Sequence, residues 1–147
     1  METVLKSILP AQTLGIEVAE WSNGRVVLSA PLDRNLNDKG TAFAGSIDAL
    51  LDLAGWSAIT LALRDAGIAA EVMIVKSETE YAAAVRADMA SVAEITASET
   101  ERVLQELQTR GRSRIALHSR LLSEGTESAA MSAQYAIMVP GNLYHPD

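Results

Sequence analysis

The sequence contains no cysteine among its 147 residues. This absence excludes disulfide bonds, thiolate metal sites, iron–sulfur clusters and a cysteine nucleophile. Aromatic residues make up only 4% of the chain, so the core must consist mainly of alanine and aliphatic side chains. Basic residues are also scarce, because 12 Lys and Arg stand against 19 Asp and Glu and give a net charge of −7. Duplex nucleic acid is therefore not an expected partner, since such binding depends on neutralising phosphates.

A long hydrophobic run is missing as well. The longest one covers residues 49–63 and is interrupted by Asp52, whereas a membrane-spanning helix needs about 20 apolar residues. We therefore expect a buried helix and no membrane partner. The first residues lack the pattern of a secretory signal, and a cytoplasmic location is expected. No repeat or Pro/Gly-rich linker divides the chain, which predicts one domain over residues 1–147.

Hydrophobic periodicity predicts the order of the secondary-structure elements. Helices are expected over residues 2–9 (ended by Pro10), 45–66 and 99–110, and strands over residues 14–19, 25–30, 73–81, 89–95, 115–121 and 131–139. In the third strand, alternation predicts one face that carries Met73, Val75, Ser77, Thr79 and Tyr81. One long apolar helix among meandering strands, without crossover helices, predicts an α+β hotdog fold, in which an antiparallel sheet wraps around the central helix.

The start of the long helix is a candidate site for polarising a carbonyl group. The first N–H groups of a helix have no internal acceptor and lie at the positive end of the helix dipole. Gly45 stands at this point of the sequence, and its missing Cβ would let a substrate approach the backbone. The alternative is that Gly45 only permits close packing of the helix on a strand.

Asp52 is the candidate general base or nucleophile. It stands between Leu51 and Leu53 in the most apolar helix, where an unpaired carboxylate is costly and its pKa is easily shifted. The alternative is a solvent-facing stripe shared with Asp48, four residues earlier, which in the first turn would complement the helix dipole. Asn37, in the preceding polar loop, could orient a water molecule or a substrate carbonyl, or could simply form a turn.

The histidines and arginines give weaker signals. His118 and His145 share no metal-ligand spacing, so we expect no metal site and no cofactor. Four arginines, in contrast, gather in a short stretch: Arg102, Arg110, Arg112 and Arg114. The last two would point to the same side of a strand and could bind the phosphates of coenzyme A or meet an acidic acyl carrier protein. The alternative is a solvated edge that discourages sheet pairing.

Two strings carry a resemblance to a known family. The first is Asn37-Asp38-Lys39-Gly40-Thr41-x-Phe43-x-Gly45-Ser46, followed by Ala54-Gly55-Trp56 in the helix, and the second is Gly111-Arg112-x-Arg114-Ile115. The chain resembles the thioesterase family known as the YiiD C-terminal domain. More broadly, the Asn37, Gly40, Thr41, Gly45 and Asp52 spacing is similar to that of PaaI-like acyl-CoA thioesterases. This broader PaaI-like group commonly has His at the position of Phe43 and Gly at that of Ala44.

This resemblance implies a hydrolase for acyl-CoA or acyl-carrier-protein thioesters. It implies a homodimer with sheets joined edge to edge, or a dimer of such dimers, with sites at the subunit interface. Asp52 would be the base or nucleophile, the Gly45 N–H would polarise the carbonyl and Asn37 would position it. The residues expected to contact the substrate are Phe43, Thr41, Ser46, Arg112 and Arg114. A non-catalytic acyl-thioester binding module is the alternative, and a dehydratase is less favoured because no His pairs with Asp52.

Overall fold

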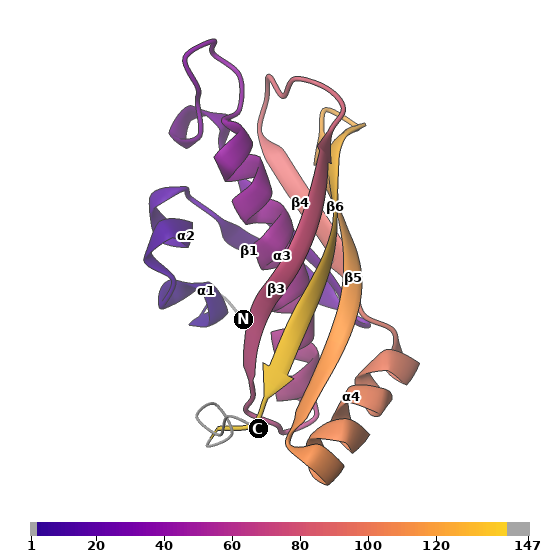
Figure 1. Cartoon of the computed structure of the whole chain (residues 1–147). Helices are drawn as coiled ribbons and strands as arrows, with labels where there is room; N and C mark the ends of the chain where they lie inside the picture. Colours follow the sequence, from indigo (N-terminus) through magenta and orange to yellow (C-terminus); the bar gives the residue numbers. More distant parts are fainter. Residues whose placement is uncertain (1–2, 141–147) are drawn as a thin grey trace.

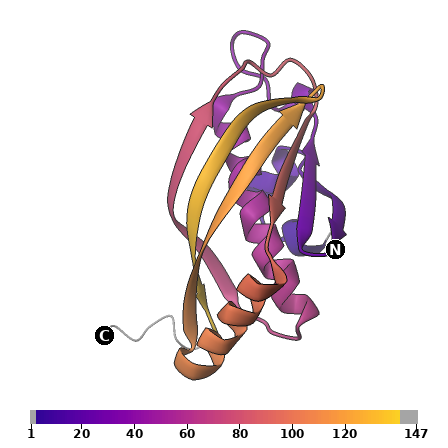
Figure 2. The same ribbon diagram turned by 90° about the vertical axis from the view of Figure 1, so that its right-hand side faces the viewer.

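The computed structural model describes residues 3–140 and has one long helix inside a curved six-stranded antiparallel sheet (Figures 1 and 2). The strand order is β1-β2-β4-β5-β6-β3. The elements are α1 (Thr3–Lys6), α2 (Leu9–Thr13), β1 (Glu17–Ser22), β2 (Arg25–Ala30), a short 3₁₀ turn (Leu32–Arg34), α3 (Ala44–Asp65), β3 (Glu71–Tyr81), β4 (Met89–Glu94), α4 (Ala97–Arg110), β5 (Arg112–Ser123) and β6 (Thr126–Met138). The predicted α+β hotdog fold is confirmed.

Helix α3 is the core of the fold. More than half of its 22 residues are buried, because the sheet curls around it and strands β2 to β6 all contact it. The helix is long and apolar enough to meet a length-and-composition criterion for a membrane span, but its apolar side chains here pack against the sheet. Gly67, with φ of +79°, follows the helix end and supplies the left-handed conformation common at that position.

Three hydroxyl groups of the sheet fix the position of α3. Ser91 of β4 donates to the Leu50 carbonyl at 2.9 Å, Ser119 of β5 to the Leu51 carbonyl at 2.9 Å and Tyr135 of β6 to the Asp52 carbonyl at 2.8 Å. Three neighbouring strands thus contact three successive carbonyls, each of which has a second lone pair free beyond the helical bond. These three hydrogen bonds fix the position of α3 along its axis and its rotation relative to the sheet at Asp52.

The N-terminal prediction was wrong in its details. Pro10 does not end a helix but lies in the first turn of α2, where its missing N–H costs no hydrogen bond. The first strand begins at Glu17 rather than residue 14. Gly15, with φ of +71°, separates the end of α2 from the strand.

The predicted face of β3 was also wrong in part. Ile74 pairs with Tyr135 and Ser77 pairs with Ala133, with a register shift between Ile74 and Lys76. This β-bulge around Val75 moves the alternation by one residue. The side of β3 toward α3 therefore carries Val72 and Ile74 before the bulge and Ser77, Thr79 and Tyr81 after it, whereas Met73 lies on the outer side.

Helix α4 lies beside the start of β5 (Figure 2). Thr96 caps its N-terminus by accepting from the Glu99 N–H at 3.1 Å, and Val103 and Leu107 are its buried residues. Gly111, with φ of +72°, ends it in the left-handed conformation. Along β5 the buried residues alternate with exposed ones, so one face packs on α3 and the other forms the outer surface.

Candidate active site

The loop between the 3₁₀ turn and α3 is held in one shape by internal hydrogen bonds. Asn35 is 3% exposed, and its side chain donates to the carbonyls of Leu14 and Pro31 at 2.9 and 2.7 Å. The backbone carbonyl of Asn35 accepts from the Phe43 N–H at 2.7 Å. The loop therefore enters α3 from a fixed direction.

Asn37 closes this loop. Its side-chain oxygen accepts from the N–H groups of Lys39 and Thr41 at 2.8 and 3.1 Å, and its side-chain nitrogen donates to the Thr41 hydroxyl at 2.8 Å. These contacts fit the turn-forming alternative. The role of Asn37 in positioning a carbonyl or a water molecule stays a prediction.

The N-terminus of α3 presents free amide hydrogens. Within residues 3–140, neither the Ala44 nor the Gly45 N–H finds an acceptor, whereas those of Ser46 and Ile47 donate to the Phe43 carbonyl at 3.0 and 3.1 Å. Phe43 is 55% exposed, and its ring lies against Gly45, with Cζ 2.8 Å from the position a Cβ would take. The space left by the missing Cβ is thus filled by Phe43.

Asp52 lies two helical turns further along and is partly buried. Burial raises the pKa of its carboxyl group, the nearby Tyr135 hydroxyl lowers it, and repulsion from Asp48 raises it further; the net shift is upward. The hydroxyl of Tyr135 also lies against Gly55, where a side chain would collide with it. Asp52 is therefore a carboxylate without a cationic partner among the described residues, and a stronger base than an exposed aspartate.

Asp48 is not in the first turn of the helix as predicted. Because α3 begins at Ala44, Asp48 is its fifth residue and faces β3. The Thr79 hydroxyl donates to its carboxylate at 2.7 Å. The hydroxyl of Tyr81, with a pKa raised by desolvation and by Asp48, is 3.5 Å from the Ala44 carbonyl. These two residues of β3 join the helix N-terminus to the strand at the sheet edge.

The remaining predicted residues fall into two places. Thr41 lies in the loop beside Asn37, and Ser46 is buried in the first turn of α3. Arg112 and Arg114 point to the same side, as predicted, but that side is the exposed outer face of β5. The sheet separates them from Asp52, which lies on α3. His145 lies outside the described residues, and residues 3–140 contain no group of three or more His, Asp or Glu able to hold a metal.

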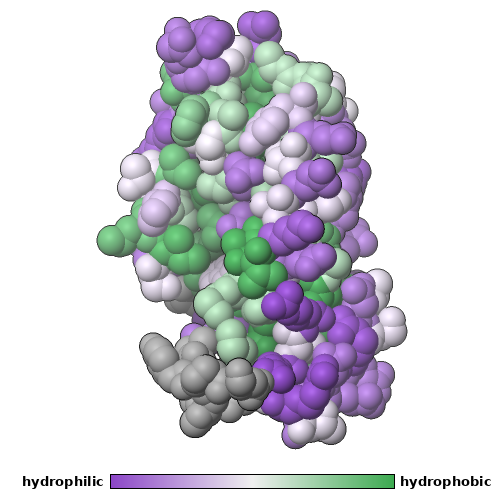
Figure 3. All heavy atoms as spheres, viewed as in Figure 1, coloured by the Kyte–Doolittle hydropathy of each residue, from purple (hydrophilic) through white to green (hydrophobic). Residues whose placement is uncertain are grey.

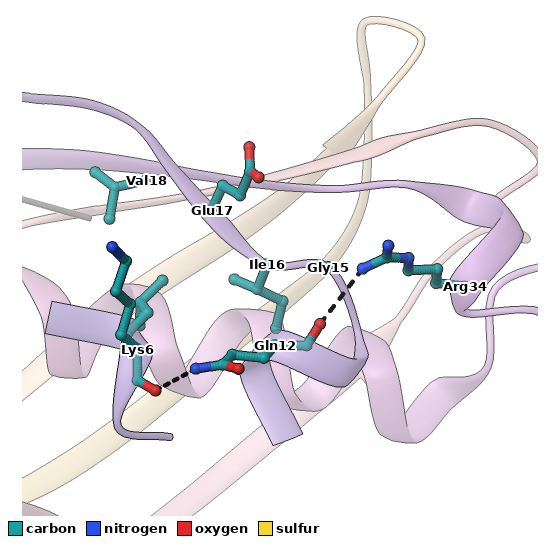
Figure 4. Close-up of a pocket in the computed structure, with 8 residues that line it drawn as sticks. Lys6, Gln12, Gly15, Ile16, Glu17, Val18 and Arg34 are labelled. Atoms are coloured by element: carbon teal, nitrogen blue, oxygen red, sulfur yellow. Dashed lines mark hydrogen bonds between the residues drawn. The ribbon is translucent and has the colours of Figure 1, made fainter. Parts of the chain in front are cut away.

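Two hollows lie near the N-terminal helices. One, of about 420 Å³, is lined by Lys6, Gln12, Glu17 and Arg34 among others, and contains none of the predicted site residues (Figure 4). The other, of about 500 Å³, lies along the second half of α3 and is lined by Trp56, Thr60 and Leu63 together with Ile68. Trp56 is one turn beyond Asp52 on the same side of the helix, and of these two hollows only the second is lined by residues of α3.

Sequence reasoning missed three contributors to the site: Thr79, Tyr81 and Tyr135. Thr79 and Tyr81 were assigned to a strand face, but their proximity to Asp48 depends on the pairing of β3 with β6. The hydroxyl of Tyr135 lies where a Cβ of Gly55 would be, but α3 contains many small residues, so the sequence does not single out this contact.

Comparison of the sequence with known protein families identifies the family of this chain. The sequence profile of a family described as "Putative thioesterase (yiiD_Cterm)" matches residues 1–139. The chain belongs to this family. The expected resemblance is thereby confirmed over nearly the whole sequence.

Solved structures agree on the architecture. A protein of unknown function from Chlorobaculum tepidum is 25% identical with a TM-score of 0.88, over 94% of this chain and 91% of that one. A "putative thioesterase" from Shewanella oneidensis is 24% identical with a TM-score of 0.84, over 95% and 94%. A protein from Pseudomonas aeruginosa described as a "probable thioesterase" is 21% identical with a TM-score of 0.80, over 93% and 91%. These similarities establish the hotdog fold.

Proposed function

We propose that this thioesterase-family chain hydrolyses an acyl thioester of coenzyme A or of an acyl carrier protein, with Asp52 as the catalytic carboxylate. One observation carries the proposal. Free N–H groups of Ala44 and Gly45 and a carboxylate with a raised pKa lie on one helix, about 11 Å apart along its axis. Reacting atoms must approach to about 3–3.5 Å, so these two groups of one chain cannot act on the same carbonyl. We therefore place the Asp52 carboxylate of one chain beside the free amides of a second copy.

The chemistry follows from these two groups. The free amides donate to the thioester oxygen and stabilise the negative charge that develops there. As a general base, Asp52 takes a proton from water while the oxygen of that water bonds to the carbonyl carbon. The carbon–sulfur bond then breaks, and the thiolate takes up the proton. As a nucleophile, Asp52 would itself bond to the carbonyl carbon and expel the thiolate before water releases the acid.

Apolar surface beside Asp52 suits an acyl group. Ile74 faces the helix opposite Tyr135, and Phe43 covers the helix start. The hollow lined by Trp56, Thr60 and Leu63 lies on the same helix, one or more turns beyond Asp52. An acyl chain placed there would remove apolar surface from water, which favours binding by roughly 0.8 kcal/mol per buried CH₂.

We also propose that two chains pair through β3. This strand ends the sheet, and its Met73, Ile74 and Val75 are each at least one-third exposed, which contributes to the hydrophobic surface over β3 in Figure 3. An unprotected strand edge with exposed apolar side chains favours pairing with another strand. A second copy would extend the sheet and bring a second wall to the side of α3 that carries Asp48 and Asp52.

The central test is Asp52→Asn. Because the amide can neither accept a proton at neutral pH nor attack the carbonyl, kcat for acyl-CoA hydrolysis should fall by a factor of about 10²–10⁴, with the circular dichroism spectrum unchanged. Asp65→Asn is the matched control on the same helix, since Asp65 is its last residue and accepts from the Trp21 indole N–H. Undiminished hydrolysis by Asp52→Asn would reject the proposal, and thioester binding without turnover by the wild-type chain would favour the non-catalytic module.

The two roles of Asp52 are distinguished by intact-mass measurement during turnover. A nucleophile adds the mass of the acyl group to the Asp52-containing peptide, and hydroxylamine removes it. A general base leaves this peptide unmodified while hydrolysis proceeds.

A further inference from the structure

A groove between α4 and the adjoining parts of β5 and β6 gathers positive charge. It has a volume of about 510 Å³, and its charged lining residues are Arg102, Glu106, Arg110, Arg112 and Arg114. Four of the 12 basic residues of a chain with net charge −7 therefore line one groove together with a single carboxylate. We call this set the arginine groove. The surface over α4, at the lower right of Figure 3, is mostly hydrophilic.

Glu106 holds two of the guanidinium groups in place. Its carboxylate accepts from Arg102 at 2.9 Å, from Arg110 at 3.2 Å and from the Ser113 hydroxyl at 2.8 Å. The hydrogen bond from Ser113, followed by the contacts with Arg102 and Arg110, lowers the pKa of Glu106. Glu106 is thus ionised at neutral pH, and it accepts from two of the four arginines that line the groove.

The backbone makes the arrangement rigid. Arg102 also donates to the Arg114 carbonyl at 3.0 Å, which ties α4 to β5. The left-handed Gly111 turns the chain directly from α4 into β5, and its carbonyl accepts from the Val139 N–H at 3.1 Å. Arg112 and Arg114 follow at alternate, outward-facing positions of β5. The guanidinium groups of Arg102 and Arg110 are consequently positioned before any ligand arrives, which reduces the entropy cost of binding.

We propose that the arginine groove is a binding site for a small ligand with two or more phosphate groups, of the nucleoside polyphosphate class. Guanidinium groups match phosphate oxygens with paired hydrogen bonds, and the groove has the volume of a small-molecule site. A single phosphate would not use four arginines. The proposal does not depend on thioester hydrolysis, because the groove opens on the outer side of the sheet, opposite α3 and Asp52.

Calorimetric titration of the full chain tests the site. The probes are inorganic pyrophosphate, ADP and adenosine 3′,5′-bisphosphate, which is the nucleotide end of coenzyme A. All three should bind, and Arg110→Gln or Arg114→Gln should weaken each by about tenfold. Arg120→Gln is the matched control, because Arg120 lies on the same outward face of β5 but pairs with Glu127 at 3.8 Å. A preference for the bisphosphate would identify a coenzyme A source, and a preference for ADP a free nucleotide.

Glu106→Gln separates a built site from general attraction between charges. The substitution makes the groove more positive, so general attraction predicts tighter pyrophosphate binding. The proposed site predicts weaker binding, because Arg102 and Arg110 lose the group that positions them. Tighter binding by Glu106→Gln, an equal loss in Arg120→Gln, or no binding of any probe at millimolar concentration and low salt would overturn the proposal.

Discussion

The environment of Asp52 comes from a few side chains on the sheet. Tyr135 donates to the Asp52 carbonyl and lies across Gly55, while Asp48 adds negative charge one turn earlier. No cation compensates Asp52 within the described part of the chain. A carboxylate in this state destabilises the folded protein, which is common for groups whose placement serves chemistry rather than stability.

Asp52→Asn should make the protein more stable at neutral pH. Folding raises the pKa of Asp52 above its ordinary value of 3.8. At a pH between the unfolded-state pKa and the higher folded-state pKa, the folded protein therefore binds more protons than the unfolded protein. The free energy of unfolding of the wild type therefore falls as the pH rises through this window. The stability advantage of Asp52→Asn should appear above pH 4 and be absent below pH 3. Urea unfolding of both proteins from pH 3 to pH 8 measures the difference, and a constant or decreasing difference contradicts it.

Gly55→Ala tests the contact between α3 and Tyr135. In an exposed helix this change is stabilising, but here the new Cβ would lie 2.8 Å from Tyr135 Cζ. We expect a loss of about 1–3 kcal/mol in the free energy of unfolding, as for other overpacked cores. Tyr135→Phe in the same background removes the closest atom and should recover part of the loss. Additive effects of the two substitutions in a double-mutant cycle would show that no collision exists.

At the scale of elements, the loop before α3 decides where the helix begins. Asn37→Ala removes side-chain bonds to Lys39 and Thr41 and should lower the free energy of unfolding by about 1–3 kcal/mol. Asn37→Asp keeps the acceptor oxygen for the two N–H groups and should lose less. Thermal unfolding measures both. If Asn37 also positions the substrate, kcat of Asn37→Asp should fall although its stability is largely retained.

The β-bulge in β3 is the second decisive element. It shifts the alternation so that Thr79 and Tyr81 face α3, and Thr79 thereby reaches Asp48. Without the bulge, strict alternation from Val72 would place both side chains on the outer face. Bulges near functional sites commonly redirect side chains in this way.

At the scale of the whole molecule, the free edge of β3 leads to a prediction about assembly. Replacing Val75 with Lys should shift the chain from dimer to monomer, because a charge on an edge strand opposes pairing. Light scattering after size-exclusion chromatography measures the mass. Ala19→Lys on β1, the opposite edge of the sheet, should leave the dimer intact. A wild-type chain that is monomeric at micromolar concentration contradicts the proposed pairing.

The sequence alone determined the fold class, the central helix and the candidate Gly45 and Asp52, because hydrophobic periodicity and a lone acid in an apolar helix are local properties. Only the tertiary structure decided that Thr79, Tyr81 and Tyr135 surround this helix, since strand register and the bulge depend on pairing between segments far apart in the chain. The same pairing put Arg112 and Arg114 on the outer face. Residue spacing gives the side of a strand, but only the packed sheet shows which side meets the helix.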